Sequence, residues 1–453
     1  MSYEGSTDSR VIPAPDQAGS PEPDHRWSPA KLIAFRFAFA ITALSAHAMI
    51  GYVPAFLPLE TLSRPLGMVL GRWDALNFRA TMSVGAFIVR ALTGSKWAVH
   101  DLIWKHRWNI PVLVLSDVLG LLVLAAFVAI VWTAIDQRRA NYSALNRPMR
   151  VYLRYALGSV MLVYALNKVI PTQFGILTPG EMLRPIGQLS HFLLLWDFMA
   201  ASAGYTFFSG LVELIGAALL FFRRTTLLGA LVLAGGLTNV IAMDMGYHVG
   251  AIHFAIIFLL LDLILLAPYL PRLFVILLGQ AESKLPLEPT PLQERWYHSA
   301  VTKGILVCVL ASPLVHVYGI RWLRSHVHTG RSVHGLFDVT AFVRNGKSVA
   351  PLASDNATWK LVACDNRSGE AQGWALSVQL ANGNLQDFHL TDDAVHHTWT
   401  IHQWGQNSTP VATLRYAVLQ DRDVSLDGKL GNDSVHMLLH PVDMKKFFPL
   451  LTR

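Results

Sequence analysis

Seven apolar stretches, each at or near the length that crosses a lipid bilayer, constrain this chain most. A spanning helix needs roughly 20 mostly apolar residues. The segments near 32–54, 110–133, 151–170, 206–222, 226–246, 251–268 and 302–320 meet or approach that length. Only 15% of the residues are charged, against about 25% in an average soluble domain. The sequence therefore predicts an all-α transmembrane bundle of about seven spans over residues 31–322.

The two ends of the chain differ from this central part. Residues 1–30 are polar and rich in Pro, Ser, Asp and Glu, a composition that predicts a disordered tail. After about Gly335 the long apolar runs stop, and residues 376–380 alternate between apolar and polar types. Asn382-Gly383 and Asp427-Gly428 are typical hairpin-turn pairs. Residues 335–453 are therefore predicted to form a small antiparallel β domain.

Basic residues predict which side of the membrane each connection faces. The loop 136–150 carries Arg138, Arg139, Arg147 and Arg150, and the turn after the fourth span carries Arg223-Arg224. By the positive-inside rule both face the cytoplasm, which gives a cytoplasmic N-terminus and an external β domain. The predicted external segment 56–109 is also basic, which departs from the rule. Apolar pieces near 80–92 and 189–202 are too short to span and predict interfacial or re-entrant helices.

Net charge and the absence of known motifs argue against several function classes. The net charge of +7 fits Lys and Arg in cytoplasmic loops and does not indicate a nucleic-acid partner. No P-loop, GxGxxG, GxSxG or HExxH motif is present, which argues against nucleotide-driven transport and common hydrolase chemistry. The histidine groups near 326–334 and 396–402 are interpreted as solvated rather than as metal ligands.

Ionisable residues inside the predicted spans are the main functional candidates, because burying a charge in a bilayer is unfavourable unless it is paired or hydrated. Lys168 and Glu213 fall at the outer half of their helices, and Asp262 falls near mid-depth. Other polar groups at similar outer depth are Asp117, Asp244, His47, Tyr52, Tyr247, His248 and His253. They predict either one hydrated cavity that opens outward or separate structural hydrogen bonds between helices. In the first case Lys168 pairs with Glu213 or with Asp117.

Several motifs resemble the DoxX-like membrane proteins. Arg154-Tyr155, Tyr164, Lys168 and Gln173-Phe174 are similar to an "RY…ML.YG..K…QF" pattern of one bacterial subgroup. The later runs that match are Trp196–Met199 with Ser202, Tyr205, Phe208, Gly210 and Glu213, then Arg223–Thr226, and then Asn239-Val240 with Tyr247. One departure is clear: the subgroup carries Asp-Val-Pro-Val-Lys after the tyrosine, where this chain has His248-Val249-Gly250.

The resemblance implies a function near a quinone. The wider group includes subunits of thiosulfate:quinone oxidoreductase and is distantly similar to the vitamin K-dependent carboxylase-like membrane fold. We therefore expect a multi-pass protein of the bacterial inner membrane, a quinone-linked oxidoreductase or a subunit of one, acting at the outer face. Lys168, Glu213 and His248 are the expected proton-handling groups. Four aromatic residues are expected to flank a ring ligand: Trp196, Phe198, Tyr205 and Tyr247.

A second hypothesis comes from another class. The chain is then a non-catalytic membrane anchor or assembly protein that presents the external β domain to a soluble partner. In that case the lipid bilayer is the main partner of the helices, and the aromatic residues form lipid contacts or bundle core.

Overall fold

The computed structural model describes residues 26–45, 60–94, 115–170, 172–175, 177–279, 333–365, 374–403 and 410–448. The side chains of 60–71, 74, 115, 365, 374 and 375 are not included in that description. A helical part is followed by an antiparallel β domain, as the sequence predicts. The predicted span near 302–320 and the tail 1–25 lie outside the described residues.

Long helices make up the first part. They are α1 (Pro29–Leu44), α3 (Glu60–Thr93), α6 (Gly120–Ile135), α7 (Ser143–Val169), α10 (Ala203–Leu220), α11 (Thr226–Gly246) and α12 (Ile252–Leu266). Shorter elements are a π-helical turn η2 (Leu115–Leu119), α8 (Pro179–Met182), a 3-10 turn η3 (Ile186–Gln188), α9 (His191–Ala201) and α13 (Leu270–Leu277). Two more described helical elements lie in the β domain, η4 (Gln420–Arg422) and α15 (Met444–Phe447).

Fewer helices than predicted are both long and apolar enough to cross a membrane. Within the described residues three meet that standard, at Ser116–Ile135, Ala203–Leu220 and Thr226–Gly246, and α12 with α13 adds a fourth if this pair, bent by 77°, is one span. The piece near 80–92 is not a short helix, because it belongs to the 34-residue α3. The piece near 189–202 is the 11-residue α9, about 17 Å long and too short to span.

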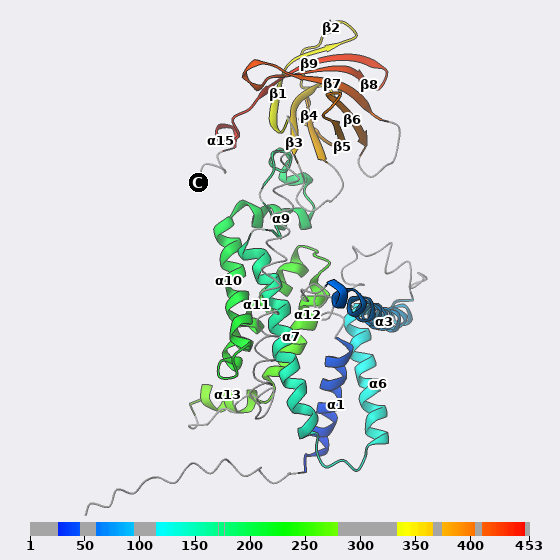
Figure 1. Ribbon diagram of the computed structural model, residues 1–453, viewed down its shortest axis with the longest axis vertical. Coiled ribbons are helices and arrows are strands. Elements are labelled where there is room, and N and C mark those ends of the chain that lie inside the picture. The colour runs from blue at the N-terminus through cyan, green and yellow to red at the C-terminus, as the bar shows by residue number, and fades with distance from the viewer. Residues whose placement is uncertain are drawn as a thin grey trace, which may run out of the picture.

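The helices pack around a continuous apolar core. Leu153 and Leu157 of α7 are fully buried against Leu121 of α6 and Leu261 of α12. Figure 1 shows α7, α10, α11 and α12 running roughly side by side, with α3 seen end-on beside the upper end of α6. α9 lies across the end of the bundle that faces the β domain. This arrangement brings the final turns of α7 and α11 and the beginning of α12 to the same end.

The β domain is a closed barrel. Its strands are β1 (Gly335–Arg344), β3 (Trp359–Asp365), β4 (Trp374–Leu380), β5 (Leu385–Asp393), β6 (Thr398–Gln403), β7 (Ala412–Val418), β8 (Val424–Leu430) and β9 (Asp433–Pro441), and each pairs antiparallel with the next. The pairing of β1 with β9 closes eight strands into a barrel, while the short β2 (Lys347–Ser348) extends from β1. Because side chains alternate along a strand, Phe337, Val362 and Leu376 fill the interior.

One hairpin prediction is confirmed and the other is wrong. Asn382-Gly383 lies in the turn between β4 and β5, and Gly383 has a φ of +86°, which favours glycine. Asp427-Gly428, in contrast, lies inside β8. A Cβ on Gly428 would sit 2.2 Å from the Thr413 carbonyl oxygen. This glycine therefore serves the close approach of β7 and β8 rather than a turn.

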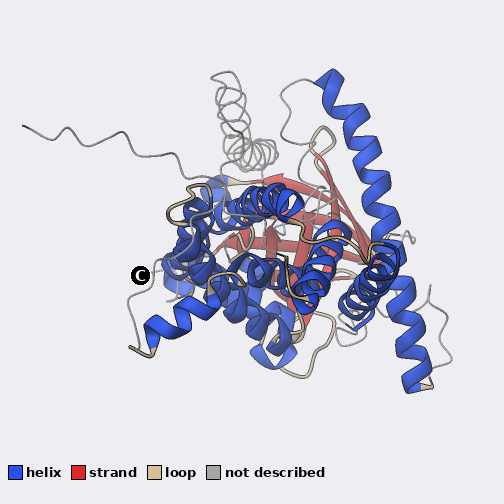
Figure 2. Cartoon of the chain, turned by 90° about the horizontal axis from the view of Figure 1, so that it is seen from below, coloured by secondary structure: helices blue, strands red, loops and turns tan. Residues whose placement is uncertain are grey.

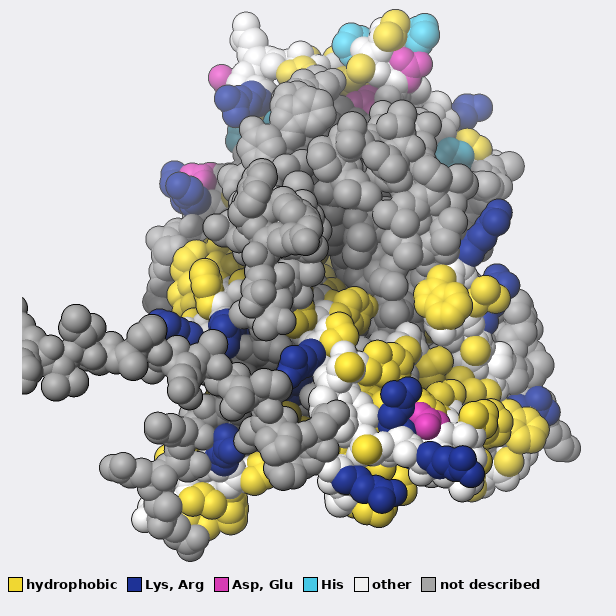
Figure 3. All heavy atoms as spheres, turned by 60° about the horizontal axis from the view of Figure 1, so that its bottom comes forward, with side chains coloured by type: hydrophobic (Ala, Val, Ile, Leu, Met, Phe, Trp, Pro, Cys, Tyr) yellow, Lys and Arg dark blue, Asp and Glu magenta, His cyan; other side chains and the backbone are white. Residues whose placement is uncertain are grey.

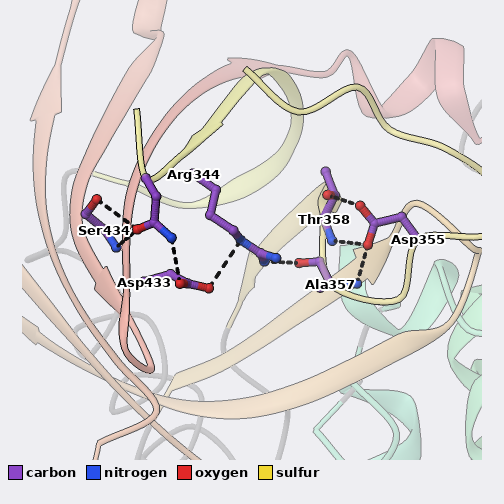
Figure 4. Close-up of polar contacts among 7 residues, drawn as sticks. Arg344, Asp355, Ala357, Thr358, Asp433 and Ser434 are labelled. Atoms are coloured by element: carbon purple, nitrogen blue, oxygen red, sulfur yellow. Dashed lines mark hydrogen bonds and ion pairs between the residues drawn. The ribbon is translucent and has the colours of Figure 1, made fainter. Parts of the chain in front are cut away.

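Polar contacts hold one rim of the barrel (Figure 4). Arg344, at the end of β1, donates from Nη2 to the Ala357 carbonyl oxygen at 3.3 Å, and its Nε lies 3.6 Å from Asp433 Oδ2. Asp355 accepts hydrogen bonds from the backbone N–H of Ala357 and Thr358 and from the Thr358 hydroxyl. These bonds join the segment before β3 to the turn between β8 and β9.

Basic side chains gather at the end of the bundle away from the barrel. Figure 2 looks from that end and shows helices in front of the strands. Figure 3 shows Lys and Arg side chains scattered among apolar ones on the same face. Arg138 and Arg139 follow α6, Arg147 lies in the first turns of α7, and Arg223 and Arg224 separate α10 from α11.

Candidate functional site

A cavity of about 420 Å³ lies among α7, α9, α10, α11 and α12. Its walls near the barrel side come from Gln173 and Phe174, which follow α7, and from Val249 and Ala251, which precede α12. Ligand pockets commonly have volumes of roughly 300–1,000 Å³. The space is therefore large enough for a small organic ring compound.

A buried ion pair lies in this cavity. Lys168, in the last turn of α7, donates from Nζ to Glu213 Oε1 of α10 at 2.5 Å. Both side chains are nearly buried, at 9% and 5% exposure. The pair forms because Gly210 lets the two helices approach closely: a Cβ there would lie 2.7 Å from Lys168 Cβ and 2.9 Å from the Ala165 carbonyl oxygen. Each charge offsets part of the desolvation penalty of the other.

A second carboxylate faces the same space. Asp244, near the end of α11, is only 8% exposed and lines the cavity with Lys168 and Glu213. Two carboxylates and one ammonium leave a formal excess of one negative charge in an apolar surrounding. An uncompensated buried charge is strongly unfavourable, so the Lys168 ammonium is needed in this space.

Three polar atoms in the cavity wall have no hydrogen-bond partner within the described chain. They are Gln173 Oε1, Ser209 Oγ and Glu213 Oε2, all buried. Buried polar groups in folded proteins are nearly always satisfied by protein, water or a ligand. Their convergence on one cavity makes it suited to a ligand that carries polar atoms.

The rest of the wall is aromatic and apolar. Trp196 stacks on Phe192, with ring centroids 4.1 Å apart, and meets Phe174 edge to face at 5.1 Å. Other rings that line the space are Tyr164, Tyr205, Phe208, Phe254 and Phe258. Offset and edge-to-face contacts of this kind suit a planar ring ligand.

Four of the seven predicted site residues line the cavity: Lys168, Glu213, Trp196 and Tyr205. The other three do not. His248 is exposed in the turn after α11, has a φ of +56° and packs edge to face on His191. Phe198 is 53% exposed and touches Tyr205 from outside. Tyr247 packs against the cluster of Phe174, Leu195, Met199 and Val249 without reaching the cavity.

The predicted single chamber is therefore only partly present. Asp117, in η2, instead accepts from the Thr81 hydroxyl at 2.9 Å, and its other carboxylate oxygen lies 3.9 Å from His253 Nε2. Of the two predicted partners for Lys168, the structure brings Glu213 and not Asp117. Asp262 is fully buried in α12, outside the lining. His47 and Tyr52 lie outside the described residues.

Sequence reasoning missed part of the site. Asp244 was placed at the right depth but not among the site residues. Gln173, Ser209 and Asn239 were not distinguished as polar groups of the cavity, although all three line it. Neutral polar residues carry no strong desolvation penalty, so the search for costly charges gave no signal for them. No group of three or more His, Cys, Asp or Glu side chains in the described part of the chain is placed to hold a metal ion.

These features define a class: a helical bundle with several membrane-length apolar helices, a polar cavity near one end and an antiparallel barrel beyond it. The chain is 31% identical over 129 residues to YwoB, an uncharacterized protein of Bacillus subtilis (strain 168). The match covers 28% of this chain and 79% of YwoB, so the chain belongs to the same family as YwoB. No protein-family model matches the chain. No solved structure matches it either.

Proposed function

We propose that this is a DoxX-like multi-pass protein of a bacterial inner membrane that binds a quinone in the Lys168–Glu213 cavity. It acts there as a quinone-linked oxidoreductase or as the quinone-binding subunit of one. The observation that carries the proposal is that an ion pair lies in one aromatic-walled cavity of about 420 Å³ together with three polar atoms that have no hydrogen-bond partner in the part of the chain that the structure describes.

The chemistry of a quinone matches this wall. Reduction of a quinone to its quinol takes up two electrons and two protons, one proton at each carbonyl oxygen. The Lys168 ammonium is a donor for a carbonyl oxygen, and Glu213 and Asp244 hold the proton that replaces it. The Ser209 hydroxyl donates to the second carbonyl. The aromatic wall excludes water and contacts the ring faces, and a partner redox protein supplies the electrons.

The test is the quinone content of purified protein. We expect wild-type protein in detergent to retain a bound quinone, and Lys168→Met and Glu213→Gln to lower its occupancy by about tenfold, which corresponds to about 1.4 kcal/mol. His248→Asn is the matched control, because His248 is polar and nearby but outside the cavity. Equal occupancy in all four proteins would contradict the proposed site.

One observation favours the alternative role as an anchor or assembly protein. The barrel is attached to the bundle through a packed interface that contains Leu183, Leu336 and Leu361, which presents the rest of its outer face to a soluble partner. The same measurement separates the two roles. Absence of quinone from correctly folded wild-type protein, together with failure to bind an added short-chain quinone, would favour the anchor.

A further inference from the structure

The connection between α7 and α9 touches two separate places. Near its beginning, Gln173 and Phe174 form part of the cavity wall. The Gln173 backbone N–H donates to the Asn167 carbonyl oxygen at 3.0 Å, and Phe174 packs in a cluster with Leu195, Met199 and Val249. This end of the connection is therefore part of the bundle.

The other end is docked on the outer face of the barrel. Leu183 packs with Leu336 of β1 and with Leu361 and Ala363 of β3. Next to it, Arg184 Nη2 lies 2.7 Å from Asp387 Oδ2 of β5. The opposite oxygen of Asp387 accepts from the Ser377 hydroxyl at 2.6 Å, which fixes the carboxylate on the sheet.

The segment between the two anchors is short. Leu183 follows Phe174 by nine positions. Within it, α8 begins with a capping box, in which Thr178 and Glu181 satisfy each other's backbone N–H groups. Because the segment is short and contains a capped turn, a movement of Arg184 relative to the barrel also displaces the cavity wall.

Loss of the Arg184–Asp387 ion pair affects the docking of α8 on the barrel, because both side chains are partly buried. The Arg184 side chain is 10% exposed and that of Asp387 is 27% exposed. Solvent screens a pair this buried less than a surface pair. Removal of one partner leaves the other charge partly desolvated, which weakens the contact between α8 and the barrel.

We propose that Arg184 is a positioning residue: its ion pair with Asp387 holds the barrel against α8 and thereby holds Gln173 and Phe174 in the cavity wall. Barrel docking and ligand binding are then coupled, and the coupling is reciprocal. The statement about the ligand rests on the proposed quinone function, whereas the statement about the wall does not.

The first measurement needs no ligand. Gln173→Cys is introduced in a background in which Cys308 and Cys364 are replaced by alanine, and the rate of alkylation of the new thiol is followed. We expect Arg184→Asp to raise this rate by about fivefold, the lower end of typical coupling. The charge swap Arg184→Asp/Asp387→Arg should restore the slow rate. Arg184→Gln is included because it removes the charge without placing two acidic groups together.

One control variant and one further measurement complete the experiment. Arg272→Asp changes an exposed arginine of α13, and we expect no change in the alkylation rate. The affinity of the full-length protein for a short-chain quinone is measured beside it and should weaken by about fivefold in Arg184→Asp and return in the swap. Unchanged alkylation in both Arg184 variants would overturn the proposal. A wild-type protein that binds no quinone would overturn only the proposed function, because the alkylation rates decide the positioning role alone.

Discussion

At the scale of single residues, the Lys168–Glu213 pair dominates the site because it is a direct, nearly buried contact between two charges. Glu213 Oε2 and Gln173 Oε1 remain unsatisfied within the described chain. Breaking a buried pair by removing one partner typically destabilises a protein by about 3–5 kcal/mol, whereas replacing both partners by neutral groups is much less harmful. The pair therefore combines a stability role with its proposed proton role.

This asymmetry gives a first prediction. We expect Lys168→Met and Glu213→Gln each to lower the midpoint of thermal unfolding in detergent, and the double variant to recover most of the loss. The reason is that the double variant removes both members of the pair, so neither is left buried without the other, while Asp244 is present in every protein compared. Losses that simply add in the double variant would show that the two side chains do not interact.

A second prediction concerns Asp355 on the barrel rim. The hydrogen bond from the Thr358 hydroxyl, followed by the Ala357 backbone N–H, lowers the pKa of Asp355 below its usual range. A carboxyl whose folded pKa is lowered stabilises the fold above its unfolded pKa of about 3.9, and this contribution is lost as pH falls through the folded pKa. Asp355→Asn should therefore destabilise the barrel at pH 7 by about 1 kcal/mol, with the difference shrinking below about pH 4.

Denaturant unfolding of the barrel at pH 7 and pH 3 measures this difference. Asp421 is the matched control, since it is an exposed aspartate of the barrel and takes part in none of the rim contacts described above. A penalty for Asp355→Asn that is equal at both pH values would mean that ionisation of Asp355 contributes nothing to the stability of the rim.

Depth along the helices was enough to predict Lys168 and Glu213, because a charge near one end of an apolar helix is visible in the sequence. The failure at His248 has a physical cause. This residue is in the turn after α11, and its positive φ is a property of the turn that depth does not encode. Asp117 and His253 have the right depth but face each other instead, an angular choice set by how η2 and α12 pack.

At the scale of elements, small residues set how closely neighbouring helices approach. Gly210 in α10 lies against Lys168 and Ala165 of α7, and Gly85 in α3 lies against the backbone of η2, where a Cβ would be 1.7 Å from the Ser116 carbonyl oxygen. The sequence shows these glycines but not their partners. The predicted helix near 80–92 is much shorter than α3, because the polar first half of this 34-residue helix shows no apolar run in the sequence.

The third prediction follows from the packing at Gly210. Gly210→Ala places a methyl group within 2.7 Å of Lys168 Cβ and should push α10 from α7. We expect a loss of about 1–3 kcal/mol in stability and weaker quinone retention, measured by thermal unfolding and by quinone content.

Gly204→Ala is the matched control, because Gly204 also lies in α10 and a Cβ there meets nothing within 4 Å. The control should be neutral or slightly stabilising, since alanine favours helices. Equal effects of the two substitutions would show that the close approach of α7 and α10 is not what supports the ion pair.

At the scale of the whole molecule, the sequence predicted the order of parts better than the number of spans. The end of the long apolar runs near Gly335, and the alternation of apolar and polar residues after it, predicted a helical part followed by an antiparallel β domain. The closure of β1 on β9 was not, because it joins residues about 100 positions apart, such as Phe337 and Pro441, that have no local signal. The docking of α8 on the barrel is likewise a contact between distant segments.

The last prediction concerns the orientation of the molecule in the membrane. The barrel lies beyond the end of the bundle that holds the cavity (Figure 1), while Arg138, Arg139, Arg223 and Arg224 lie at the opposite end. Basic residues between spans are retained on the cytoplasmic side, so we expect the cavity and barrel to face outward.

Val395 is 83% exposed in the barrel, and Gln137 is exposed directly after α6. In a background with Cys308 and Cys364 replaced by alanine, a membrane-impermeant maleimide should label Val395→Cys in spheroplasts and Gln137→Cys only after permeabilisation. The reverse pattern would place the cavity on the cytoplasmic side, where quinone reduction would take its protons from the cytoplasm. Labelling of both cysteines in sealed spheroplasts would contradict a bundle that separates these two ends across the bilayer.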